Sequence, residues 1–429
     1  MNKRNRLIIL IICVALFLFI SPYIALYSMG YRINLETWKI NATGGIYVRT
    51  FPAADQIIFD SKIFKKPGIF NNAVFVQDLL PKQHSVLIKK EGYFDYEKTL
   101  QIQEKEVAKI ENIILFKTNI IFNELLKNSE SFTLSPDKKH ILVELSKTNS
   151  LDFHYFEVSN LQKQKTYSIP LQYTSVLDVI WSDDSKKVLI KTQNSRGVAF
   201  YILDFTNPST SSGQQKTSLS YLDKNSKNIS FNPQNSEEIF FMMDNSLFLF
   251  KDKKIITIAR NLIDYKIENG NIIWTSSTGV KNKSDITSKT TSIIEENPKD
   301  IFIDELKTNY KILNSPDGKN MIYYNNSEIY LHSFDANKKE NNIKLFSSNY
   351  PETITECFWL NNDYIIFQSG NKIIASEIDF RGNINAIEIP QTYPLSLESK
   401  TPKFIYNSED SKVYILTNKT LYSSEKILP

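Results

Sequence analysis

Histidines, cysteines and neighbouring carboxylates are the residues of this sequence best suited to chemistry, and they are few and scattered. The chain holds two cysteines and four histidines among 429 residues. Asp183 and Asp184 are adjacent, but they belong to a turn pattern that explains them without a metal. No histidine has the spacing that is typical of a metal site. The histidines are His84, His140, His154 and His332.

Motifs for nucleophilic and phosphate chemistry are also missing from the sequence. It has no Gly-x-Ser-x-Gly elbow, no glycine loop that would hold a phosphate and no Asp-rich calcium loop. We therefore predict no catalytic, cofactor-binding or metal-ligating residues, no cofactor, and a binding protein rather than an enzyme. The alternative that stays open is a hydrolase or lyase of the cell envelope, acting on glycans or peptides with residues from separate strands.

A short turn recurs along the chain from about residue 135 onward. Its clearest copy, Ser-Pro-Asp-Gly-Lys, spans Ser315–Lys319 and precedes the apolar run Met321–Tyr324. Pro presets the backbone angle of a turn and Asp and Gly complete it, so a β-rich run after such a turn indicates a hairpin. Copies begin near Ser135, Ser182, Asn232, Ser315, Leu360 and Asn407.

The spacing of these turns indicates a repeat. Most copies lie about 47 residues apart. The wider gap after Asn232 holds a weaker copy, Ile267–Trp274, with Asn269-Gly270 as its turn. Units of this size, running from about Thr118 to the C-terminus, predict a mainly β fold with a β-propeller of about seven four-stranded blades, while six or eight blades stay open. The alternative is that such turns recur by chance in an all-β protein.

The Ser-Pro-Asp-Gly-Lys turn resembles that of bacterial WD-repeat-like propellers of the Tol-associated type, which implies a fold rather than a function. A propeller must close without a free edge strand, so we expect a strand near Asn119–Phe122 to pair beside Thr420–Ser423 in the last blade. Trp181, Trp274 and Trp359 flank the repeated turns and are predicted to pack between blades. The enzyme alternative would place its active site on the axial face of this propeller.

The N-terminus predicts a membrane anchor. Met1–Arg6 is basic, and the following Leu7–Met29 carries no charge and is long enough to cross a bilayer as a helix. We predict that residues 1–30 form a cytoplasmic basic tip and a single transmembrane helix, with the rest of the chain outside the cytoplasm at the cell membrane. A cleaved signal peptide with its site near Ser28–Gly30 is the alternative.

Residues 31–43 are predicted to be a juxtamembrane linker and residues 44–117 a small antiparallel β-sandwich, because apolar and polar residues alternate between turns. The second segment resembles the PEGA domain, although Lys82 stands where that family usually has Gly and the stretch 61–72 lacks the usual Gly-x-Thr-Pro. The resemblance implies an extracytoplasmic β module without known catalysis, in which His84 packs in a strand and Gly92 takes a positive φ. The matching residues are Gly45–Val48, Pro52-Ala53-Ala54, Leu80-Pro81, His84 and Lys90-Glu91-Gly92-Tyr93.

Composition limits the partners. The formal net charge is +4, with lysines and acidic residues interspersed, so we expect no nucleic-acid binding. The predicted partners are the membrane, through residues 7–29, and an envelope protein or a polysaccharide, with the oligomeric state left open. Cys13 and Cys357 are not expected to form a disulfide. Within the predicted propeller, residues 118–429, the polar tracts Thr206–Lys216 and Ser276–Thr290 are predicted to be exposed loops.

Overall fold

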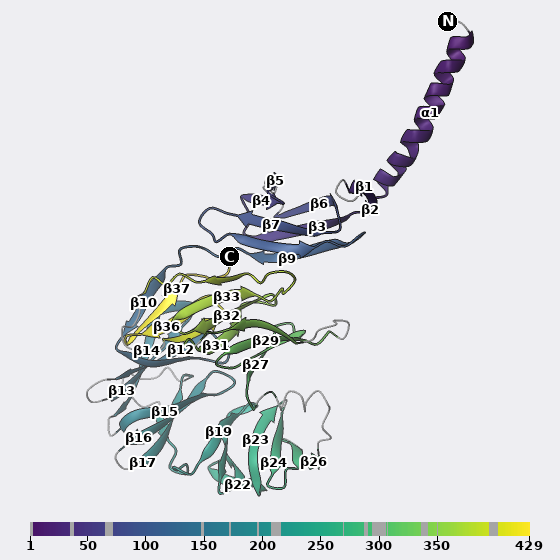
Figure 1. Ribbon diagram of the computed structural model, residues 1–429. Coiled ribbons are helices and arrows are strands. Elements are labelled where there is room, and N and C mark those ends of the chain that lie inside the picture. The colour runs from purple at the N-terminus through teal and green to yellow at the C-terminus, as the bar shows by residue number, and fades with distance from the viewer. Residues whose placement is uncertain are drawn as a thin grey trace. The chain divides into compact units, whose positions relative to one another are not determined.

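The computed structural model is mainly β, with one long helix at the N-terminus (Figure 1). It divides into two compact units: unit 1 comprises Met1–Ile121, Tyr310–Thr392 and Glu425–Pro429, and unit 2 comprises Phe122–Asn309 and Tyr393–Ser424. The residues that the structure describes are 3–34, 38–64, 72–146, 150–170, 173–194, 197–206, 216–268, 270–286, 291–293, 306, 308–335, 342–349, 351–393 and 402–429.

Helix α1 (Lys3–Ser28) contains the apolar run that the sequence predicted to cross a membrane. Its segment Leu7–Ser28 has 22 residues, which at 1.5 Å per residue is about 33 Å, and none of its residues is buried against the rest of the protein. Helix α1 is therefore long and apolar enough to cross a membrane, a form that membrane anchors and signal sequences share.

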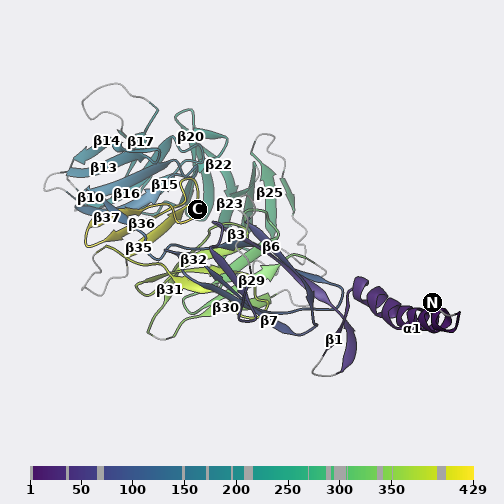
Figure 2. The same cartoon turned by 90° about the horizontal axis from the view of Figure 1, so that it is seen from above.

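The segment predicted as a linker contains a two-stranded hairpin, β1 (Tyr31–Asn34) and β2 (Lys39–Ala42). The hairpin extends sideways from the end of α1 (Figures 1 and 2). Hydrogen bonds between the two residues that flank it extend the hairpin, since Gly30 O accepts bonds from Thr43 N at 2.8 Å and from Thr43 Oγ1 at 2.6 Å.

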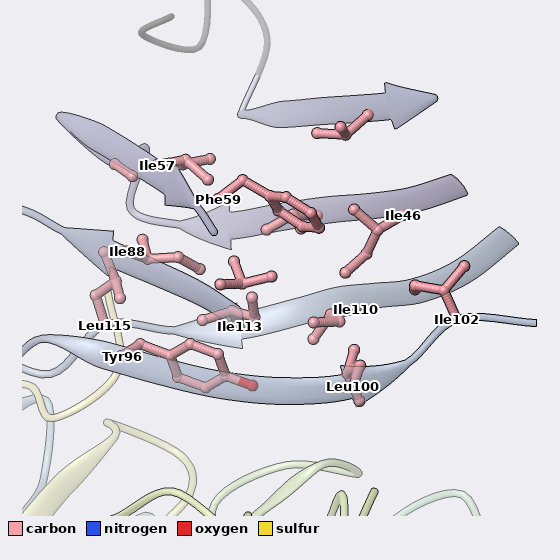
Figure 3. Close-up of a cluster of buried hydrophobic side chains, with 14 residues drawn as sticks. Ile46, Ile57, Phe59, Ile88, Tyr96, Leu100, Ile102, Ile110, Ile113 and Leu115 are labelled. Atoms are coloured by element: carbon pink, nitrogen blue, oxygen red, sulfur yellow. The ribbon is translucent and has the colours of Figure 1, made fainter. Parts of the chain in front are cut away.

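The small β domain packs two sheets against each other around one apolar core (Figure 3). Alternate residues of its strands are buried, as the period-two pattern predicts: in the β7 segment His84, Val86 and Ile88 face inward. One pairing differs from the antiparallel expectation, because β3 and β9 run parallel. The sheets are β6 (Ala73–Leu79), β3 (Gly44–Phe51) and β9 (Val107–Ile114), and β5 (Lys62–Phe64), β4 (Gln56–Phe59), β7 (Gln83–Lys89) and β8 (Tyr96–Gln101).

The rest of the described chain forms seven four-stranded antiparallel sheets, as in β-propeller blades. Six of them have their strands in sequence order, and the seventh has the order β10-β37-β36-β35. In unit 2 these strands are β11 (Ser129–Leu134), β12 (His140–Ser146), β13 (Ser150–Glu157) and β14 (Asn160–Pro170); β15 (Tyr173–Trp181), β16 (Lys187–Asn194), β17 (Gly197–Asp204) and β18 (Lys216–Ser218); β19 (Lys227–Asn232), β20 (Asn235–Met243), β21 (Ser246–Lys251) and β22 (Lys254–Arg260); β23 (Leu262–Glu268), β24 (Asn271–Ser276), β25 (Lys281–Asp285) and β26 (Thr291–Ile293); and β10 (Phe122–Lys127), β37 (Thr420–Ser424), β36 (Lys412–Thr417) and β35 (Lys403–Asn407). In unit 1 they are β27 (Lys311–Asn314), β28 (Asn320–Tyr324), β29 (Glu328–Ser333) and β30 (Asn342–Ser347), and β31 (Ile354–Trp359), β32 (Tyr364–Ser369), β33 (Lys372–Glu377) and β34 (Ala386–Glu388).

The last sheet of unit 2 contains the closing strand that the sequence predicted. Strand β10 pairs antiparallel with β37, so that Phe122 lies opposite Ser424 and Lys127 opposite Thr420. Strand β10 begins at Phe122, the last residue of the predicted segment, and continues beyond it. The first strand of the propeller region and the last strand of the chain therefore share one sheet.

The three predicted tryptophans pack where successive sheets meet. Trp181 joins a cluster from β12–β17, Trp274 one from β20–β24, and Trp359 one from β27–β33. Trp359 Nε1 also donates a hydrogen bond to Leu313 O at 3.1 Å. Their predicted packing between blades is confirmed within each unit.

Two smaller expectations were wrong or fall outside the described residues. Ser276–Thr290 is not simply a loop, because Lys281–Asp285 forms β25 and pairs with strands on both sides. Most of the tract Thr206–Lys216 lies outside the described residues. Cys13 and Cys357 are both free, as expected.

Candidate binding cleft

The repeated turn is held by its own polar side chains. Ser315 Oγ donates to Asp317 Oδ1 at 2.7 Å, and the backbone N–H of Lys319 donates to the same oxygen at 3.1 Å. These hydrogen bonds hold the pKa of Asp317 below its usual range. Gly318 completes the turn with a φ of +69°. The turns around Ser135 and Ser182 have the same Ser-to-Asp bond, at 2.5 and 2.7 Å.

The turns also bond to the corresponding turns of other sheets within each unit. These bonds make the repeated motif a connector between sheets, so its carboxylates have structural partners. They run from Asp137 N to Ser185 Oγ (3.0 Å), from Ser236 Oγ to Asp184 Oδ2 (2.9 Å), from Asn407 Nδ2 to Lys138 O (3.0 Å) and from Asp317 N to Asn362 Oδ1 (3.1 Å).

Each of the four histidines has a local partner. His84 is buried, with Nδ1 2.6 Å from Asp60 Oδ2 and Nε2 2.8 Å from Leu80 O, so its predicted packing in a strand is confirmed. His140 stacks on Tyr155. His154 and His332 contact Gln164 and Asn342. Across the described residues, no group of three or more His, Cys, Asp or Glu side chains could hold a metal ion.

The best-defined polar site of unit 1 is a junction between β8 and the segment Glu377–Asn385, which follows β33. Lys98, on the inward face of β8, is fully buried, and its Nζ donates to Glu377 Oε1 at 2.6 Å and to Asp379 O at 2.5 Å. Tyr96 Oη donates to the other oxygen of Glu377 at 2.8 Å. Burial, together with the nearby charge of Glu377, raises the pKa of Tyr96, which stays neutral and donates.

Two asparagines cover the free edge of β8. The N–H of Thr99 donates to Asn383 Oδ1 at 2.9 Å, and Asn383 Nδ2 donates to Glu97 O at 2.7 Å. Asn385 Oδ1 accepts the N–H of Glu97 at 3.2 Å. Strand β8 ends its sheet, so these amides satisfy backbone groups that would otherwise be open to another strand. Gly382 allows this approach: its φ is +71°, and a Cβ there would lie 1.9 Å from Thr99 O.

A cleft of about 510 Å³ lies beside this junction, within unit 1. One wall is β9, an edge strand of its sheet. The opposite wall comes from the turn that contains Asp317 and from the loops that end β31 and β33. The residues that line the cleft are Lys109–Ile113, Asp317, Asn320, Leu331, Asn362–Tyr364 and Glu377–Arg381.

The cleft is acidic. Its lining carries five carboxylates, Glu111, Asp317, Asp363, Glu377 and Asp379, against two cationic side chains, Lys109 and Arg381. Glu377 and Asp379 are paired with Lys98, and Asp379 also with Arg381, which leaves three carboxylates less fully compensated.

Asp363 has the most unusual environment in the cleft. Burial raises its pKa, and the negative charges of Asp317 and Asp379 raise it further, whereas a 2.9 Å hydrogen bond from Asn112 Nδ2 opposes the rise. By contrast, the pKa of Asp379 is lowered: burial would raise it, but the bonds from Arg381 and the charge of Lys98 outweigh burial. The cleft therefore holds one carboxyl group that takes up a proton more easily than its neighbours.

This arrangement suits recognition of a cationic or hydrogen-bonding group. The lining residues include no serine, cysteine or histidine, so the cleft lacks the residue types most used for nucleophilic catalysis. Carboxylates and amides can accept hydrogen bonds from a partner, and the excess of negative charge favours a basic one. The edge of β9 is already partly occupied, because Lys109 O accepts a bond from Arg381 Nη2 at 2.8 Å and Ile114 N donates to Tyr364 Oη at 3.1 Å.

A second hollow of about 430 Å³ lies in unit 2, beside the first strands of two sheets, β19 and β23. Its polar groups already bond to each other: Asn228 Nδ2 donates to Asp264 Oδ1 at 2.6 Å, and Tyr265 Oη donates to Asn228 O at 2.5 Å. Because these bonds occupy its main polar groups, this hollow is the weaker candidate.

The sequence did not indicate the residues of the junction. Lys98 did carry a signal, because it falls on the inward face of the alternating strand Tyr96–Gln101, where a charge needs a buried partner. Nothing in the sequence pointed to Glu377 as that partner, since the two lie 279 positions apart.

No known family model matches the chain, and no curated protein matches it. Solved structures similar to it include YCF48 bound to D1 peptide (TM-score 0.41, 11% identity, 72% of this chain and 95% of that one). Others are the β-propeller domain of Cps50 (Swd1) from Myceliophteria thermophila (0.40, 8%, 72% and 98%) and virginiamycin B lyase from Staphylococcus aureus (0.39, 13%, 72% and 100%). Similarities this weak carry no argument about function, and the propeller assignment rests on the strand order described above.

Proposed function

We propose that this chain is a single-pass membrane protein that displays a binding propeller outside the cytoplasm. The observation that carries the proposal is the acidic cleft of unit 1, held in shape by a buried ion pair and continuous with the domain that follows α1. The 22-residue length of the apolar segment of α1 supports an uncleaved anchor, and the basic residues before it support a cytoplasmic N-terminus.

The proposed partner is an envelope protein or a surface polysaccharide, bound along β9. A protein partner would lay an extended segment along the cleft and place a lysine or arginine near Asp317 and Asp363. In this proposal the small sandwich is a PEGA-like module that forms one wall of the cleft. The two-sheet architecture and the positive φ of Gly92, +77°, support that resemblance.

Site-specific photo-crosslinking in intact cells tests the proposal. A photoreactive phenylalanine at Glu111, which is exposed in the cleft, should crosslink a partner. The same residue at Lys62, exposed on β5 at the other edge of the sandwich, is the matched control. Asp317→Lys should abolish the crosslink from Glu111, because it reverses a charge on the opposite wall. Identical products at both positions would refute the cleft as the binding site.

Two biochemical tests separate the membrane anchor from the cleft. Full-length protein should stay with membranes in alkaline carbonate, and added protease should digest the β domains only from the extracytoplasmic side. Release of full-length protein into the soluble fraction would refute the anchor without bearing on the cleft.

A second candidate function, hydrolysis or cleavage of envelope glycans, is favoured by one observation. Glycosidases use two carboxyl groups, one of which has a raised pKa and donates a proton. Asp363 has such a pKa, and Asp317 lies close enough to raise it. Incubating the protein with peptidoglycan fragments and analysing the products tests this function. Turnover that is lost in Asp363→Asn would establish it, and unchanged substrate would reject it.

A further inference from the structure

The hairpin β1–β2 presents an unusually exposed apolar surface. Trp38, at its turn, has 81% of its surface exposed, and Ile40 on β2 has 57%. Met29, between α1 and the hairpin, is 68% exposed. Single exposed apolar residues are common on proteins, but a nearly bare tryptophan ten residues after the end of a long apolar helix is not explained by packing within this chain.

Specific contacts fix the hairpin to the end of the helix. Arg32 of β1 donates from Nη1 to Tyr27 O at 2.7 Å, and its guanidinium lies 3.4 Å from the centre of the Tyr27 ring. These contacts join β1 to the last turn of the helix, and the bonds from Thr43 to Gly30 O close the base of the hairpin beside them. The hairpin is therefore a continuation of the helix and not a free linker.

The hairpin is also joined to the sandwich. Arg32 forms an ion pair with Asp78, at the end of β6, with a distance of 2.7 Å, and the N–H of Lys105 donates to Thr43 O at 3.0 Å. The same short segment thus contacts the helix on one side and the β domain on the other.

We propose that the hairpin lies in the lipid headgroup layer where α1 leaves the bilayer, with Trp38 and Ile40 inserted between lipids. The proposal rests on the proposed membrane anchoring by α1. Continuity with the helix favours lipid as the occupant, because the apolar part of α1 ends at Ser28, and only two residues separate Ser28 from β1. Indole rings favour the membrane interface, since their faces are apolar and their N–H needs a polar partner. The exposed Lys39 beside Trp38 suits the anionic and polar groups of the same layer.

The consequence would be a fixed orientation of the small β domain relative to the membrane. A helix that enters the domain through a flexible linker leaves the domain free to tilt, whereas a helix with an inserted hairpin holds it at two points on the membrane. The sandwich, which forms one wall of the cleft, would then face the membrane at a constant angle.

Tryptophan quenching in nanodiscs tests this proposal with the full-length chain. Bromine atoms on lipid chains quench indoles that they contact. The chain has four tryptophans, so the contribution of Trp38 is the difference between the wild type and Trp38→Phe. We expect lipids brominated near the headgroups to lower this component roughly twofold, and lipids brominated near the bilayer centre to quench it much less. Ile40→Asp should shift the emission of Trp38 to longer wavelength, because it carries the hairpin into water.

Two results would overturn the inference, and they differ in what else they overturn. Equal quenching of the wild type and Trp38→Phe in discs that retain the protein would remove the hairpin from the interface and leave the anchor intact. Failure of the full-length protein to associate with discs would overturn both the inference and the proposed anchor. A crosslink from position 38 to a protein, without quenching, would assign the surface to a protein partner and also refute the lipid assignment.

Discussion

Replacing Lys98 with methionine is the sharpest test of the junction. The substitution keeps most of the length and apolar stem of the side chain, so it removes the charge without leaving a large cavity. Lys98 has no exposed surface, and its partner Glu377 has only 4% of its side chain exposed. The variant would therefore leave a buried carboxylate without its counter-ion.

The structure allows the magnitude to be worked out. In the variant, Glu377 keeps neutral donors only: Tyr96 Oη at 2.8 Å and two groups of Asn385, at 2.9 and 3.0 Å. Removing one partner of a buried ion pair typically costs about 3–5 kcal/mol. The three remaining bonds place the expected cost near the lower end, at about 3 kcal/mol.

The double variant Lys98→Met, Glu377→Gln should recover part of this loss. With both charges gone, no buried carboxylate remains unpaired, and a glutamine can still accept the bond from Tyr96. Pairs of this kind show coupling because each single change leaves the other group buried and uncompensated.

Hydrogen exchange is the assay of choice, because the chain has several domains and its unfolding in denaturant need not be two-state. The amide protons of Glu97 and Thr99 are bonded only to side chains of Asn385 and Asn383, so they report opening of the junction directly. A loss of about 3 kcal/mol corresponds to exchange roughly 100-fold faster in detergent-solubilised full-length protein.

Lys89→Met is the matched control. Lys89 pairs with Asp95 at 2.9 Å in the same small domain, but both side chains are about half exposed. Such a pair contributes about 1 kcal/mol or less, so exchange of Glu97 and Thr99 should hardly change. Similar exchange in the two variants would refute the reasoning that burial makes the Lys98–Glu377 pair important.

Three further predictions concern the loop that contains Gly382, the closing strand β37 and the repeated turn at Asp317. Gly382→Ala should destabilise the same junction by about 2 kcal/mol or more, because Gly382 has a positive φ and an added Cβ would clash with Thr99 O. Hydrogen exchange of the Glu97 and Thr99 amides measures this loss. Gly279→Ala is the control: Gly279 has a similar φ but no neighbour within 4 Å, so the change should cost only about 1 kcal/mol. Deleting 420–429 should lower the melting temperature sharply, because β10 then loses its partner β37, while deleting only Leu428 and Pro429 keeps that strand and the buried Ile427 and should have a small effect. The pKa of Asp317 is lower in the folded protein than in the unfolded chain, so its contribution to stability is complete above the unfolded pKa of about 3.9 and is lost as the pH falls through the folded pKa. Ser315→Ala removes a bond that lowers this pKa, so it should weaken the dependence of the urea midpoint on acid pH. An unchanged dependence would contradict this prediction.

The sequence predicted the repeated parts of this protein well, because each repeat carries its own local signals. A turn such as Ser315–Lys319 needs only neighbouring residues to form, and the alternation that follows decides which side chains face the core. The closing pair β10–β37 could be predicted although its strands lie far apart, since a propeller must satisfy its free edge.

The candidate cleft could not be predicted in the same way. Its walls come from β9 and from loops more than 200 positions later, and no single-sequence pattern specifies which loop meets which strand. The parallel pairing of β3 with β9 was missed for a related reason, because alternation reveals the buried face of a strand but not the direction of its neighbour. The hairpin β1–β2 was missed because its four-residue strands are too short to show a period.

The contacts of unit 1 also bear on how the cleft would work at a membrane. Polar contacts connect the helix with the cleft: Tyr27 O accepts a bond from Arg32, Arg32 pairs with Asp78 of the sandwich, and the sandwich holds Glu377 through Lys98. A flexible linker at any of these points would let the cleft sample many heights above the bilayer. These contacts would hold the cleft at a fixed distance from the bilayer. A partner anchored in the same envelope would then meet the cleft at one height. Capture would then depend on the reach of the partner, and lengthening the chain between Ser28 and Tyr31 should weaken it even though no residue of the cleft has changed.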